Sequence, residues 1–146
     1  MQLLLFTVSG LHYALPLAAV EKVFPAAEVK PLPGAPQIVE GFISLAGRIV
    51  PIFDIRSRFN LGQKPTALTD RIILANAGKR KVGIVADSVG EVLDTDDIID
   101  AEIVHPDLLQ FKGVVKIAGD MALIQDLDSF LFPEENKALD EALGTG

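Results

Sequence analysis

An internal repeat constrains the fold of this chain more than any other feature of its 146 residues. The segment from Gly41 to Ser57 matches the segment from Gly113 to Ser129 at an offset of 72 residues. A weaker similarity, at an offset of 68 to 69, relates Gly10–Val23 to Gly78–Val92. Repeated segments of this kind predict two similar, closely packed subdomains. The main pair of segments is identical at Gly41/Gly113, Ala46/Ala118, Gly47/Gly119, Ile52/Ile124, Asp54/Asp126 and Ser57/Ser129.

Each copy of the main repeat predicts a strand, an Ala-Gly turn, a returning strand and a helical turn. Gly47 and Gly119 are expected at turn positions with positive φ, where a Cβ atom is unfavourable. Asp54 and Asp126 are expected to cap the helical turns by accepting backbone N–H groups, which stabilises such a turn by about 1 kcal/mol. These four residues are therefore predicted to determine the fold.

The remaining apolar runs are short, rich in Val, Ile, Leu and Phe, and bounded by turn-forming residues, which is typical of β-strands. Five short strands form a stable unit best when the sheet curls into a small barrel. The predicted fold class is mainly β, with two five-stranded β-barrel subdomains and short helical turns at Leu17–Ala19, Asp54–Phe59 and Asp126–Leu131. The predicted strands are Gln2–Val8, Leu11–Leu15, Val20–Phe24, Glu40–Leu45, Arg48–Phe53, Arg71–Asn76, Lys81–Ala86, Gly90–Leu93, Lys112–Ala118 and Asp120–Gln125.

The domain organisation is predicted from breaker residues and from the C-terminal segment. Residues 60–69 are polar and contain Gly and Pro, so they are expected to connect the two lobes. The lobes pack closely as one domain over residues 1–132, and residues 133–146 form a helical tail. A helix from Pro133 to Leu143 can dock on the body through Leu139 and Leu143, which lie four residues apart. The alternative for this tail is a frayed terminus.

Composition excludes several classes of function. The formal net charge of −7 disfavours nucleic-acid partners and anionic membrane surfaces. The absence of cysteine excludes disulfides, thiol catalysis and thiolate metal sites. The apolar run Leu3–Val8 is too short for a signal-peptide core or a membrane span. We therefore expect a cytoplasmic protein with no nucleic-acid partner and no direct membrane insertion.

The motifs that resemble catalytic or metal sites are incomplete. The segment Ala86–Gly90 around Ser88 differs from the nucleophile-elbow pattern Gly-x-Ser-x-Gly at one residue, Ala86. That elbow needs a strand-to-helix turn, whereas the residues after Ser88 predict more strand. The acidic segment Asp94–Asp100 lacks the Gly and Glu of a calcium loop. The two histidines, His12 and His105, are not at metal-ligand spacing. The sequence thus predicts no catalytic residue, no cofactor site and no metal site.

From Leu3 to Leu131 the order of motifs resembles the CheW-like family of bacterial chemosensory adaptors. The resemblance implies two SH3-like five-stranded barrels and a non-enzymatic scaffold. It also implies two partners, the regulatory domain of a CheA-type histidine kinase and the cytoplasmic tip of a methyl-accepting chemoreceptor, with recruitment to receptor arrays at the inner membrane. The segments that carry the resemblance are Leu4–Val8 with Tyr13–Val23, Pro31–Pro36 with Glu40–Ile43, Gly47–Arg56, and Val82–Val92.

The resemblance also implies where the partners bind. The family's kinase-binding surface lies at the barrel ends, around the second lobe, and its receptor-binding groove lies between the lobes. The residues of this chain that fall at the groove by position are Val20, Glu21, Val23, Gly41, Ser44, Ala46 and Val85.

The chain departs from the family at its Asn-Leu-Arg-Gly motif, where it has Ser44-Leu45-Ala46-Gly47. An arginine at the turn can make bidentate contacts with carboxylates, and Ala46 cannot. This departure favours an alternative, a module that binds the kinase without engaging receptors. Two alternatives of other classes are a small serine hydrolase built on Ser88 and a ligand-binding barrel. Arg48 and Arg56 are interpreted as solvated side chains.

Overall fold

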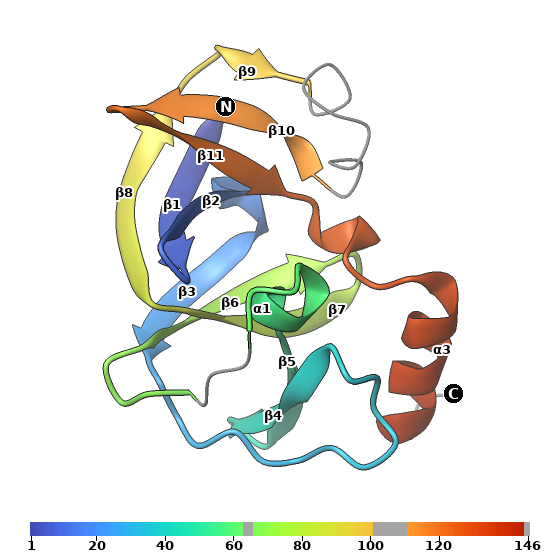
Figure 1. Ribbon diagram of the computed structural model, residues 1–146. Coiled ribbons are helices and arrows are strands. Elements are labelled where there is room, and N and C mark those ends of the chain that lie inside the picture. Colours follow the sequence, from blue (N-terminus) through green and yellow to red (C-terminus); the bar gives the residue numbers. More distant parts are fainter. Residues whose placement is uncertain (63–65, 101–110, 145–146) are drawn as a thin grey trace.

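The computed structural model describes residues 1–62, 66–100 and 111–144. Its strands form a six-stranded sheet in the order β8-β1-β2-β11-β10-β9 and a five-stranded sheet in the order β3-β6-β7-β5-β4 (Figure 1). The prediction of a mainly β fold with two SH3-like subdomains is confirmed. Within the described residues, the six-stranded sheet stays open between β8 and β9.

The strands follow the apolar runs of the sequence closely. The short strand β9 was not predicted, because its two isoleucines are flanked by aspartates and form too short an apolar run. The strands of the six-stranded sheet are β1 (Gln2–Val8), β2 (Leu11–Pro16), β8 (Ser88–Asp94), β9 (Ile98–Ile99), β10 (Phe111–Ile117) and β11 (Asp120–Gln125). Those of the five-stranded sheet are β3 (Val20–Pro25), β4 (Val39–Leu45), β5 (Arg48–Phe53), β6 (Arg71–Ala77) and β7 (Arg80–Ala86). The helical elements are η1 (Leu17–Ala19), α1 (Ile55–Arg58), η3 (Leu127–Ser129) and α3 (Pro133–Ala142).

The two halves of the chain exchange strands. The six-stranded sheet combines β1 and β2 with β8–β11, and the five-stranded sheet combines β3–β5 with β6 and β7. The chain therefore crosses between the sheets at η1 and at Asp87, which separates β7 from β8. The expected connector at residues 60–69 does not join the two sheets. It follows α1 and precedes β6, and so it links β5 and β6 of the same five-stranded sheet. A repeat identifies similar units, but long-range pairing decides which copies share a sheet.

The two copies of the main repeat form equivalent hairpins. The β4–β5 and β10–β11 hairpins each shift register near the start, beside Gly41 and Gly113. A Cβ atom on Gly41 would lie 2.1 Å from the carbonyl oxygen of Lys30, and one on Gly113 would lie 2.7 Å from that of Ile99. The strand after each hairpin turn pairs in parallel with a strand from another part of the chain, β5 with β7 and β11 with β2.

The turn and cap residues have the local geometry that their types favour. Gly47 and Gly119 have φ values of 80° and 74°. The carboxylate of Asp54 accepts the backbone N–H of Ser57 at 3.3 Å, and that of Asp126 accepts the N–H of Asp128 at 3.1 Å. Ala46, which precedes Gly47, also has a positive φ of 50°, a conformation that is unfavourable for a residue with a Cβ atom.

The main core lies between the two sheets. Tyr13 stacks near Phe6, Phe59 and Phe111, with ring centroids 5.8 to 6.4 Å apart. A second, smaller core of Ile43, Val50, Ile52, Ile72, Leu74 and Val85 fills the five-stranded subdomain. The shared aromatic core makes the two subdomains one packing unit, because large buried rings contribute strongly to stability.

Helix α3 packs against the body of the protein. Leu139 is fully buried in the main core, and Leu143 packs at its border. Glu135 accepts the backbone N–H of Phe132 at 2.7 Å and forms an ion pair with Arg58. Among the described residues, no helix is long and apolar enough to cross a membrane.

Candidate protein-binding surface

Two of the seven predicted binding residues, Glu21 and Ala46, line the same surface groove. The groove has a volume of about 310 Å³ and lies at the end of the five-stranded subdomain, beside the β4–β5 turn. Its apolar wall comes from Leu45, Val50 and Leu74. Three charged side chains that were not predicted as binding residues form its rim: Lys22, Arg48 and Lys81.

An ion pair joins two strands at this rim. The ammonium group of Lys81 on β7 donates to both carboxylate oxygens of Glu21 on β3, at 2.7 and 2.8 Å. The hydrogen bond from Lys81, with the nearby charges of Lys22 and Arg48, lowers the pKa of Glu21. Glu21 and Lys81 are 60 residues apart, and no local pattern predicts their contact.

Val20, Val23 and Ser44 lie outside the groove. Val23 is 38% exposed on β3, an edge strand of its sheet, whereas Val20 is partly buried against the main core. Ser44 is exposed on β4 opposite Ile49 of β5. These residues can contact a partner only as a surface separate from the groove.

Gly41 and Val85 are buried and are not available to a partner. Gly41 allows β4 to approach the carbonyl oxygen of Lys30, which accepts a hydrogen bond from Phe42 at 2.8 Å. Val85 is only 8% exposed and packs in the smaller core. Both residues have structural roles. Of the seven positions implied by the resemblance, five therefore remain at or near the protein surface.

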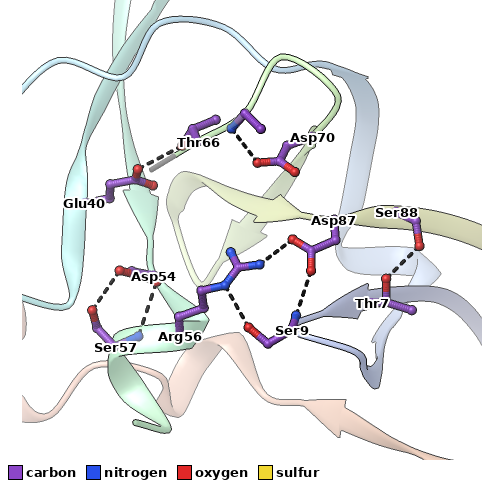
Figure 2. Close-up of polar contacts among 11 residues, drawn as sticks. Thr7, Ser9, Glu40, Asp54, Arg56, Ser57, Thr66, Asp70, Asp87 and Ser88 are labelled. Carbon is purple, nitrogen blue, oxygen red and sulfur yellow. Dashed lines mark hydrogen bonds and ion pairs between the residues drawn. The ribbon is translucent and has the colours of Figure 1, made fainter. Parts of the chain in front are cut away.

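Arg56 connects three segments where the chain crosses between the sheets (Figure 2). Its Nε donates to the hydroxyl of Ser9 at 2.8 Å, and its guanidinium forms an ion pair with Asp87. Asp87 also accepts the backbone N–H of Ser9 at 2.7 Å. The interpretation of Arg56 as a solvated side chain was wrong, because the residue is only 7% exposed. Its partners lie 47 and 31 residues away, so the sequence carries no local signal for them.

Ser88, the candidate nucleophile, has no base as a hydrogen-bond partner among the residues that the structure describes. Its hydroxyl contacts the hydroxyl of Thr7 at 2.6 Å (Figure 2). Ser88 continues into β8, whereas a nucleophile elbow would lead into a helix. His12 lies near Asp120 at 3.5 Å, and His105 is outside the described residues. No cluster of three potential metal ligands is present in the described part of the chain.

A second carboxylate with a shifted pKa lies at a different hollow. Glu40 is half-buried and accepts a hydrogen bond from the hydroxyl of Thr66 at 2.8 Å (Figure 2). Burial raises the pKa of Glu40, and the nearby carboxylates of Asp54 and Asp70 act in the same direction. No local pattern in the sequence predicts this environment, because it comes from separate segments of the chain.

Comparisons with known proteins identify the family. The CheW-like domain matches residues 2–133. The chemotaxis protein CheW of Rhizobium meliloti is 29% identical over 140 residues, covering 93% of this chain and 90% of that protein. The chemotaxis protein CheW of Thermotoga maritima is 26% identical over 132 residues, covering 89% of this chain and 87% of that protein. The crystal structure of the scaffolding protein TtCheW from Thermoanaerobacter tengcongensis superposes with a TM-score of 0.81 at 26% identity, covering 92% of this chain and 89% of that one. The chain therefore belongs to the family of the CheW-like domain.

Proposed function

We propose that this protein is a cytoplasmic adaptor of chemosensory signalling that links chemoreceptors to a CheA-type histidine kinase. Its family consists of non-enzymatic adaptors, and the relatives named above are chemotaxis and scaffolding proteins. The observation that carries the proposal is the groove at the end of the five-stranded subdomain. An apolar wall with a charged rim is the arrangement that protein interfaces use.

The groove supports a specific role for residue 46. Ala46 lines the groove from the exposed tip of the β4–β5 turn. The resemblance to the family implies an arginine at this position. An arginine there would extend over the groove and could pair with a carboxylate of the receptor tip. With alanine, receptor binding depends on the apolar wall and on Lys22, Arg48 and Lys81. The kinase-only module remains the second candidate, favoured by the same short side chain.

The variant Ala46→Arg tests which candidate applies. Binding of the purified protein to a receptor cytoplasmic fragment and to the kinase regulatory domain is measured by calorimetry. If the groove binds receptors, Ala46→Arg strengthens receptor binding at least about tenfold, because one charged contact contributes about 1.5–3 kcal/mol. Kinase binding should not change. The control is Ala118→Arg, an exposed residue at the equivalent turn of the other sheet.

Three results would support the second candidate function or contradict the proposal. Kinase binding with no receptor binding by either form supports the kinase-only module. Equal strengthening by Ala46→Arg and Ala118→Arg would contradict the groove, because it would show only a general effect of added charge. Affinity capture from native cells that recovers no histidine kinase would contradict the adaptor function itself.

A further inference from the structure

A second surface adjoins the groove and has a different character. We call it the basic shelf and define it by Arg48, Ile49, Pro51, Lys79, Arg80 and Lys81. These residues line a hollow of about 510 Å³ on the five-stranded sheet. The shelf shares Arg48 and Lys81 with the groove, so the two surfaces are continuous.

The shelf is the uncovered end of a sheet face that is buried elsewhere. Ile49, Pro51 and Phe53 alternate along β5 and lie on one face. Phe53 is buried and stacks on Phe130 at 4.7 Å, whereas Ile49 is 52% exposed. Leu143, just after the end of α3, lines the hollow and marks the border between the covered and uncovered parts.

Helix α3 shows which kind of segment this part of the protein binds. Between Pro133 and Ala142 the helix carries four acidic residues and one lysine. It inserts Leu139 into the core, and its Asp140 forms an ion pair with Arg80 of the shelf. An acidic amphipathic helix therefore already meets one edge of the shelf through the carboxylate of Asp140, while Leu139 anchors it in the adjoining core.

The charge on the shelf is unusual for this protein. The chain has a formal net charge of −7, yet four cationic residues gather here. Arg80 and Lys81 have carboxylate partners, but Arg48 and Lys79 form no ion pair with any described residue. Unpaired cations beside exposed apolar area attract and orient an acidic partner.

The equivalent position on the other sheet is a natural comparison. Met121 corresponds to Ile49 in the repeat and is 46% exposed. The residue before it is Asp120, where the shelf has Arg48. Met121 lies opposite Lys116, so similar apolar exposure occurs there with one cation and one carboxylate instead of four cations. The effect of charge on binding can therefore be tested within one molecule.

We propose that the basic shelf binds an acidic amphipathic helix of a partner protein, alongside α3. The helix places an apolar side chain on Ile49, beside the buried Pro51, and carboxylates near Arg48 and Lys79. The site lies next to the groove of the proposed function but does not depend on receptor binding there.

The test uses a hydrocarbon-stapled helical peptide that repeats the α3 segment Lys137–Leu143 and carries a fluorescent label. Binding to the full-length protein is followed by fluorescence anisotropy. We expect binding to weaken at least about fivefold when salt is raised from about 50 to about 300 mM, because screening reduces attraction between exposed charges. The double variant Ile49→Glu, Lys79→Glu should reduce affinity by about tenfold or more.

The matched control is the double variant Met121→Glu, Lys116→Glu, which changes a cross-strand pair on the other sheet. It should bind the peptide as the unmodified protein does. Circular dichroism verifies that both variants fold; if the shelf variant does not, Lys79→Ala with Arg48→Ala replaces it.

Equal loss in both variants, or equal binding of a peptide with lysine in place of its acidic residues, would overturn the proposal. Binding that survives the shelf substitutions would also overturn it, because the peptide would then occupy the α3 site.

Discussion

Arg56 of α1 forms an ion pair with Asp87, the residue at which the chain leaves the five-stranded sheet for the six-stranded one. Ser9, in the β1–β2 turn, contacts both partners. The ion pair and the two hydrogen bonds of Ser9 thus join three segments at the junction of the subdomains (Figure 2).

Replacing Arg56 with alanine should destabilise the protein by about 2–4 kcal/mol, because Asp87 would lose a charged partner in a partly buried site. Urea unfolding measures the change, with Arg71→Ala, at an exposed residue of β6, as the control. The double variant Arg56→Ala, Asp87→Ala should lose less than the sum of the single variants. Strict additivity would show that the pair contributes no coupling.

Replacing Ala46 with glycine should stabilise the protein by about 0.5–1 kcal/mol, because its φ of 50° is unfavourable for a residue with a Cβ atom. Thermal and urea unfolding measure the effect. Ala118 is at the equivalent turn but does not have a positive φ, so Ala118→Gly should be neutral or destabilising. A gain of the same size at both positions would argue against backbone strain at Ala46.

Replacing Gly41 with alanine should destabilise the protein by about 3 kcal/mol or more, because the new methyl group would meet the backbone of Lys30 at 2.1 Å. Gly90→Ala is the control, since a Cβ atom there would lie 3.6 Å from its nearest neighbour, the carbonyl oxygen of Leu5. Denaturant unfolding compares the two. Unchanged stability in Gly41→Ala would mean that the Lys30–Phe42 bridge is not needed for the fold.

Replacing Glu40 with glutamine should stabilise the protein most at neutral pH. Burial raises the pKa of Glu40 in the folded state, so the folded protein holds this proton more tightly than the unfolded chain. The resulting stabilisation is present at low pH and is lost as pH rises through the raised pKa of the folded state. Glutamine cannot ionise and can still accept the hydrogen bond from Thr66.

Thermal unfolding from about pH 4 to about pH 7 checks this, because the range spans the titration of a glutamate with a raised pKa. The advantage of Glu40→Gln should increase with pH, whereas Glu91→Gln on the exposed strand β8 should show no such trend. An advantage that decreases with pH would contradict the burial of a charged carboxylate at this site.

The local structure was largely predictable, because short-range preferences decide it. Alternating apolar residues and glycine-containing turns define the hairpins, and Asp54 and Asp126 cap the helical turns that follow. The candidate site was predictable only in part. Glu21 and Ala46 do line one groove, but Gly41 and Val85 are buried, because a resemblance gives positions along a chain and not which side chains reach the surface.

By itself the sequence determined two similar β-units, their turns and caps, and the family to which they belong. Only the tertiary structure decided that the halves exchange strands, that Arg56 is buried against Asp87, and that four cations meet beside Ile49. Each of these features joins residues far apart in the chain. Their contacts depend on which strands pair and which faces are covered, and the periodicity of a single segment does not contain that information.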